Sequence, residues 1–215
     1  MATMVQASFW PLMDAQPTRI DPAEQLEQQL EFSAQNFYDT CILNLLSANL
    51  FTREGRDPVY LYSRTWMHNQ QINTDNKNTC RFLTYLQIAM DQEIGTGGIL
   101  RHQAITGNRA IMARYVILYL WLGSESRYTD LDQPVPSGPS FWETNDAFDA
   151  LETDGNEEGY NILAVFCRKQ AQDIEATVDP HLSEHLDDDD KTRSQTWKTL
   201  ADILEGKSIH QPPLP

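Results

Sequence analysis

Apolar side chains recur at the helical period in the first long patterned stretch of the chain, residues 20–50. Asp21 and Pro22 precede the stripe as an N-cap residue and a first-turn proline. A second apolar stripe, Tyr38, Ile42 and Leu46, lies on the same stretch and would allow two copies of the chain to pair there in a dimer. The pattern predicts a long amphipathic helix that ends near Gly55. Its main stripe has steps of three or four residues and consists of Leu26, Leu30, Ala34, Phe37, Cys41, Leu45 and Ala48.

The same Asp-Pro start predicts two further helices, at Asp57-Pro58 and at Asp179-Pro180. Residues 76–95 carry an apolar face and end at Gly95, so they predict another helix. Residues 110–122 are apolar on nearly every side, and this run is too short for a bilayer, which needs about 20 residues of helix. We therefore expect a buried central helix, in which Arg114 pairs with a carboxylate in the core.

Helical patterns return after a proline-rich stretch at residues 124–140. Ser140 and Glu143 form a capping box before residues 141–152, and a stripe follows in residues 157–178. A last apolar face, from Trp197 to Leu204, ends at Gly206. The sequence thus predicts an all-α protein, a bundle of about seven helices. We divide it into an N-terminal extension (1–21), a helical body (22–123), a proline-rich linker (124–140), an acidic helical part that packs on the body (141–206) and a proline-rich tail (207–215).

The negative charge is concentrated in one part of the chain. The net charge is -15, from 31 acidic residues and 16 lysines and arginines. Residues 125–190 contain 18 of the acidic residues and only three basic ones, so they account for the whole surplus and the rest is neutral. Such asymmetry bears on partners. We expect either a basic protein partner on this acidic surface or a surface that covers arginines of the body.

Four consecutive aspartates, Asp187, Asp188, Asp189 and Asp190, form the densest part of this acidic surface. Like charges crowded on one helix repel one another, so we expect them to interrupt the helix that begins at Asp179. On that same helix, His181, Glu184, His185 and Asp188 would share one face and could hold a metal ion. The spacing departs from the H-E-x-x-H pattern of zinc enzymes, and a solvated acidic face is the simpler interpretation.

The stretch "GTGGILRHQAITGNR", residues 95–109, gathers four glycines between two predicted helices. It lacks the lysine and spacing of a phosphate-binding loop and the spacing of a dinucleotide fingerprint, so turns at Gly97-Gly98 and Gly107-Asn108 are the simpler interpretation. Arg101, His102 and Arg109 nevertheless make this stretch a candidate site for an anion or a nucleic acid. No motif indicates a cofactor, and we expect none.

The chain ends in "PPLP", Pro212, Pro213, Leu214 and Pro215. Such a segment favours polyproline II structure, which WW and SH3 modules recognise. We expect a non-enzymatic adaptor or accessory protein, of a composition that would suit a viral or mobile-element protein. One alternative is a helical nucleoprotein or coat subunit, and another is a metal-dependent hydrolase that uses the histidine face. The nucleoprotein would contact phosphates through Arg53, Arg56, Arg64, Arg101 and Arg109.

Three widely spaced cysteines, Cys41, Cys80 and Cys167, suggest neither a disulfide framework nor a zinc knuckle, and they fit a reducing compartment. The N-terminal apolar run has no basic residues before it and is broken by Pro11, which is a poor match to a signal peptide. We therefore expect an intracellular protein, cytoplasmic or nuclear, with no membrane contact.

Overall fold

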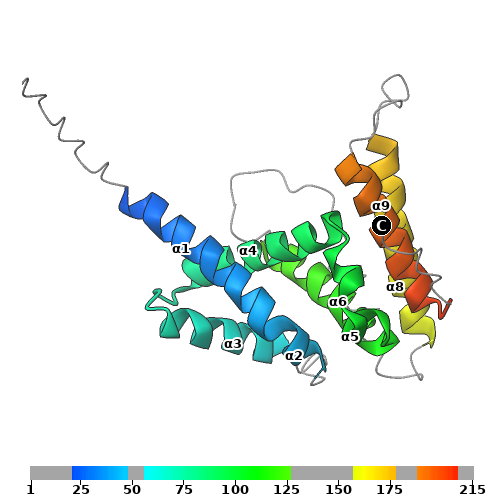
Figure 1. Cartoon of the computed structure of the whole chain (residues 1–215). Coiled ribbons are helices and arrows are strands. Elements are labelled where there is room, and N and C mark those ends of the chain that lie inside the picture. The colour runs from blue at the N-terminus through cyan, green and yellow to red at the C-terminus, as the bar shows by residue number, and fades with distance from the viewer. Residues whose placement is uncertain (1–20, 48–55, 127–156, 178–187, 208–215) are drawn as a thin grey trace, which may run out of the picture.

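The computed structural model describes residues 21–47, 56–126, 157–177 and 188–207, and these residues form helices and turns without any strand. If residues 22–47 are counted as one continuous helix, the described residues contain seven α-helices. The expectation of an all-α multi-helix bundle is confirmed. In Figure 1, α1 crosses in front of α4, α3 lies below them, and the pair α8 and α9 stands beside this group.

The first helix begins where the sequence predicts. Asp21 caps α1 (Pro22–Phe37), and its carboxylate accepts a hydrogen bond from the Ala23 amide at 3.0 Å. The helix then widens into one π-helical turn, η1 (Tyr38–Ile42), and continues as α2 (Leu43–Ser47). The added residue of a π-helical turn shifts the apolar face. Both predicted stripes consequently become part of one core.

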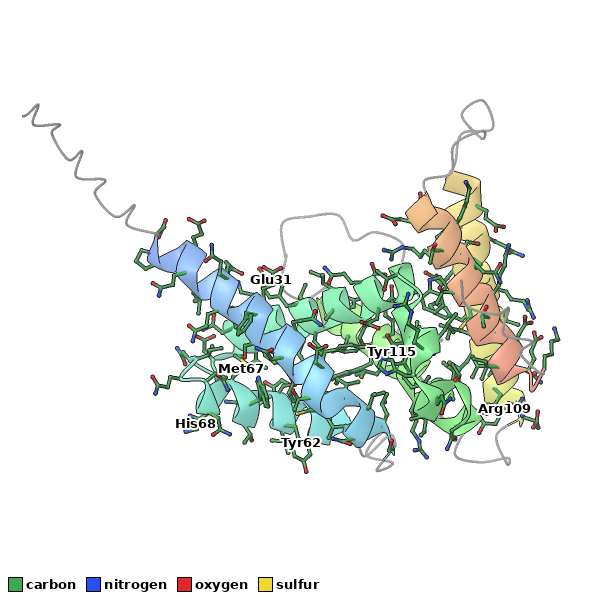
Figure 2. The ribbon with its side chains drawn as sticks, viewed as in Figure 1. Glu31, Tyr62, Met67, His68, Arg109 and Tyr115 are labelled. Carbon is green, nitrogen blue, oxygen red and sulfur yellow. The ribbon has the colours of Figure 1, made fainter. Side chains whose placement is uncertain are left out.

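The second stripe of this helix offers no dimer face. Tyr38, Ile42 and Leu46 are all buried in the chain's own core. The hydroxyl of Tyr38 lies 3.5 Å from that of Tyr115, and Tyr115 donates to the Met90 carbonyl at 3.3 Å. Figure 2 places Tyr115 in the interior between these helices. The expectation that this stripe allows pairing between copies is therefore wrong, because the same residues pack against this chain's own helices.

Two helices flank the first one. α3 (Arg56–Asn69) begins one residue before the predicted Asp57, and α4 (Asn76–Gly95) begins after Asp75, whose carboxylate accepts from the Asn78 amide at 2.7 Å. The predicted apolar face of α4 is buried at Phe82, Leu86, Ala89 and Met90. Trp66 of α3 lies edge-to-face with Phe37 of α1, at a centroid distance of 5.6 Å.

The central helix is α6 (Arg109–Ser126), which the sequence predicts as apolar all round. Residues on several of its sides are buried, including three successive ones, Tyr115, Val116 and Ile117, whose side chains point about 100° apart. We expected Arg114 to pair with a carboxylate. In the described part of the chain it instead donates to the backbone carbonyl of Leu46 at 2.7 Å. That oxygen belongs to the last turn of α2, where carbonyls lack intrahelical partners. Desolvation lowers the pKa of Arg114.

α8 (Glu157–Thr177) and α9 (Asp188–Leu204) form an antiparallel pair, which we call the C-terminal hairpin. Its predicted stripes are buried, including Leu163 and Cys167 of α8 and Trp197 and Leu200 of α9, and they join one hydrophobic cluster with the body. α9 begins within the aspartate run, so these charges lie at a helix N-terminus, where the helix dipole stabilises them. Gly206 ends the hairpin in the left-handed conformation, with φ of 71°.

Several predictions fall outside the described residues. They are the helix start at Asp179, the capping box at Ser140, most of the proline-rich linker and the end of the first helix near Gly55. Among the helices that the structure describes, none has the length and apolar content needed to span a membrane.

Candidate functional site

The glycine-rich stretch forms a compact turn between α4 and α6. Gly97 has φ of 66°, a left-handed conformation that favours glycine, and it leads into a 3₁₀ turn, η3 (Gly98–Arg101). A single helical turn, α5 (Gln103–Thr106), follows, and Asn108 then caps α6 by accepting from the Ala110 amide at 3.0 Å. The two predicted turns are present, although the sequence does not predict the short helices between them. The Asn108 side chain therefore already occupies the backbone amides of Ala110 and Ile111 at the start of α6.

Two glycines of this turn, Gly95 and Gly97, lie against helix α9. A Cβ atom on Gly95 would lie only 2.8 Å from a terminal guanidinium nitrogen of Arg193, so any larger residue would displace that side chain. A Cβ on Gly97 would meet the Thr196 hydroxyl at 3.5 Å. The close approach of α9 thus accounts for Gly95, whereas a Cβ atom on Gly107 would meet the Gln103 carbonyl at 2.8 Å, so neither position needs a phosphate ligand to explain its glycine.

An ion pair and two aromatic rings hold α9 next to this turn. Arg193 lies 2.5 Å from a carboxylate oxygen of Asp91 on α4, and Tyr119 of α6 donates to the other oxygen at 3.2 Å. The ring of Tyr119 also packs edge-to-face on Trp197, at a centroid distance of 5.3 Å. Burial is the main cause that raises the pKa of the Tyr119 hydroxyl, and the Asp91 charge adds to it. Tyr119 therefore stays protonated and donates to Asp91.

Arg109 connects α6 to both helices of the hairpin. Its Nε donates to the Leu204 carbonyl at 2.5 Å, and its two terminal nitrogens contact the carboxylate of Glu157 at 2.6 and 3.0 Å. The guanidinium also stacks over the ring of Tyr160, 4.0 Å from the centroid. The hydrogen bonds that Arg109 donates to the Glu157 carboxylate lower the pKa of Glu157. Arg109 thus already holds an oxyanion, a carboxylate of its own chain.

The other two residues of the candidate anion site are on the surface of the same turn. The Arg101 side chain is exposed, and His102 is partly exposed with its Nε2 3.9 Å from a carboxylate oxygen of Glu93. A neighbouring carboxylate disfavours a second anion at His102. Anion binding by Arg101, His102 and Arg109 stays a prediction.

Three basic side chains of the described hairpin, Arg168, Lys198 and Lys207, pair with its own carboxylates. Arg168 contacts Asp202 at 2.9 Å and Glu205 at 2.6 Å, and Lys207 also contacts Glu205. Lys198 and Glu175 form a further pair across the two helices at 2.5 Å. Hydrogen bonds from Arg168 and Lys207 lower the pKa of Glu205 to about 2. With nine acidic and six basic residues, the described hairpin keeps a net charge of -3, and no local sequence motif predicts these pairs.

Arginines of the body also have protein partners. Arg64 donates to the Thr74 carbonyl at 3.1 Å, and Arg81 contacts Glu27 at 2.7 Å. Of the arginines assigned to phosphate contacts in the nucleic-acid alternative, Arg64 and Arg109 thus tie together parts of this chain. Arg53 and the side chain of Arg56 lie outside the described residues.

The candidate metal and partner residues lie largely outside the described parts. This holds for His181, Glu184 and His185, for Asp187, and for the tail residues Pro212, Pro213, Leu214 and Pro215. The backbone of Asp188 begins α9, and Asp189 and Asp190 are exposed in its first turn. No group of three or more potential metal ligands occurs within the described ranges.

Comparison of the chain with protein-family models, with curated proteins and with solved structures finds no match.

Proposed function

We propose that this chain is a non-enzymatic adaptor or accessory protein that binds a basic protein partner through its acidic surface. The observation that carries this proposal is the position of the unbalanced charge. Residues 127–156 and 178–187 together contain ten acidic residues and one arginine, a net charge of -9. The exposed Asp189 and Asp190 adjoin the second of these segments in sequence.

The ion pairs of the hairpin support this choice of surface. Arg168, Lys198 and Lys207 pair with neighbouring carboxylates within the hairpin, and Arg193 pairs with Asp91 of α4. These cations therefore do little to neutralise the two acidic segments. A surplus of one charge sign speeds association with a partner of opposite sign and makes binding dependent on salt.

The alternative of nucleic-acid binding has weaker support. Phosphate contacts require a surplus of lysine and arginine on one face, whereas the chain outside residues 125–190 is neutral. Two of its proposed arginines, Arg64 and Arg109, also donate within the protein. The hydrolase alternative needs His181 and His185, which lie outside the described residues.

Capture on the immobilised full chain separates the first two functions. Native lysate is passed over the protein with and without nuclease, at low and at moderate salt. Basic proteins that remain after nuclease treatment and elute as salt rises support the adaptor function. Recovery that depends on intact nucleic acid contradicts it and favours the nucleoprotein.

A further inference from the structure

One face of helix α8 carries charges of opposite sign at its two ends. Glu158, Ile162, Val165 and Lys169 follow one another at steps of four, three and four residues. Because each residue of an α-helix turns by about 100°, these steps place the four side chains within about 60° of the helix surface. We call these four residues the α8 stripe. It is about 16 Å long and reads acidic, apolar, apolar, basic.

The described part of the chain leaves this stripe accessible. Glu158 and Lys169 are exposed, Val165 is 68% exposed, and Ile162 is partly buried against the core. Within the described residues, neither Glu158 nor Lys169 forms an ion pair, whereas their sequence neighbours Glu157 and Arg168 do. The two charges of the stripe are therefore available to groups outside this chain.

The stripe is complementary to itself in the antiparallel direction. A two-fold axis midway between positions 163 and 164 sets Glu158 of one copy opposite Lys169 of the other, and Ile162 opposite Val165. By symmetry the contact contains two ion pairs, one at each end of four apolar side chains, and it closes as a dimer. A parallel arrangement would instead set each charge against its own sign, and like charges repel.

We propose that two copies of the chain associate through the α8 stripe as an antiparallel pair. This contact goes beyond the proposed adaptor function, because it uses neither acidic segment of the chain. When the two helix axes lie about 8–10 Å apart, Ile162 and Val165 exclude water at the centre and the ion pairs form a polar rim. The contact is much smaller than a standard interface of about 1,600 Å², so we expect a weak dimer with a Kd of the order of 0.1 mM.

Charge reversal at the two ends of the stripe tests this proposal. The association of the full chain is measured by sedimentation equilibrium at about 0.15 M salt, which screens charges more than about 8 Å apart and so limits repulsion between two acidic chains. Glu158→Lys and Lys169→Glu each give the stripe a single sign, and each should weaken association at least fivefold. An equimolar mixture of these two variants should associate as strongly as the native chain, because a basic stripe then meets an acidic one.

Matched substitutions elsewhere separate the stripe from general effects of charge and hydrophobicity. Lys77→Glu reverses an exposed lysine of α4 and gives the same net charge as Lys169→Glu, but it should leave the Kd within twofold of the native value. Val165→Ser should weaken association severalfold, whereas Leu61→Ser, at an exposed residue of α3, should not. Circular dichroism should stay unchanged in every variant.

Three results would overturn the proposal. The first is a native chain that stays monomeric up to about 1 mM, ten times the expected Kd. The second is a loss of association that is equal for Lys169→Glu and Lys77→Glu. The third is a mixture of the two charge-reversed variants that associates no better than either variant alone.

Discussion

Replacing Arg109 with methionine should destabilise the attachment of the C-terminal hairpin to α6. Methionine retains most of the aliphatic packing and removes the guanidinium group. The lost hydrogen bond to the Leu204 carbonyl involves a charged donor, which is typically worth about 1.5–3 kcal/mol. The lost stacking on Tyr160 adds about 0.5–1 kcal/mol at a partly exposed site.

The Glu157 carboxylate adds little to this loss because its side chain is 71% exposed. Since a quarter of the Arg109 side chain is also exposed, water replaces part of each lost contact. We therefore expect the free energy of unfolding to fall by about 2 kcal/mol. Urea denaturation followed by tryptophan fluorescence measures this change, and hydrogen exchange should show the largest loss of protection in α8 and α9.

Two variants serve as controls for this prediction. Arg101→Met removes an exposed arginine from the same turn and should change the stability by less than about 0.5 kcal/mol. Glu157→Gln should retain most of the stability, because the Leu204 and Tyr160 contacts stay. If Arg109→Met is no less stable than Arg101→Met, the assignment of Arg109 as the connection between α6 and the hairpin is refuted.

Four further predictions follow from single contacts. Gly97→Ala should cost about 1 kcal/mol in urea denaturation, because alanine is strained at φ of 66°; an unchanged midpoint would contradict the geometry of the turn. Ser63→Ala should leave the free energy of unfolding unchanged or raise it, since Ser63 Oγ is buried without a hydrogen-bond partner in the described residues. Thr79→Val should lower the free energy of unfolding by about 1 kcal/mol, because it removes the 2.8 Å hydrogen bond from Thr79 Oγ1 to the Asp75 carbonyl. Glu205 has a lowered pKa, so its contribution to the stability of the fold is complete above pH 4.5 and disappears as the pH falls towards 2. The difference in Tm between the native chain and Glu205→Gln should therefore shrink over that range. A constant difference would rule out the pairing of Glu205 with Arg168 and Lys207. A WW module that recognises "PPLP" should bind the full chain in a fluorescence titration and bind Pro213→Ala at least tenfold more weakly, and equal affinities would exclude the tail as its ligand.

Much of the fold could be predicted from the sequence because helix caps and apolar periodicity are local signals. Asp21 caps α1 as expected, and the stripe that ends at Leu204 is buried on α9. The π-helical turn at Tyr38–Ile42 could not be predicted, since it depends on packing against α4 and α6. That turn also explains why two apolar stripes of one helix share a single core.

The candidate site was harder to predict because its contacts join residues far apart in sequence. The sequence predicts the two turns of the glycine-rich stretch, but the need for glycine at position 95 comes from Arg193, on a helix about a hundred residues later. Likewise, nothing near Arg109 in the sequence indicates Glu157 or Leu204 as partners. The excess charge, by contrast, is visible in the sequence and needs no tertiary information.

The most direct test of the central claim compares three immobilised full-length chains in parallel after nuclease treatment, with bound proteins quantified by mass spectrometry. The first is the native chain, the second has Asp187–Asp190 replaced by asparagine, and the third has four exposed carboxylates outside residues 125–190 replaced by the corresponding amides, at Asp21, Glu24, Glu31 and Asp39. We expect a basic protein that is recovered equally on the native and third chains, and whose recovery on the second chain is at least tenfold lower. Equal recovery on all three chains, or equal loss from the second and third, would contradict binding through the acidic surface.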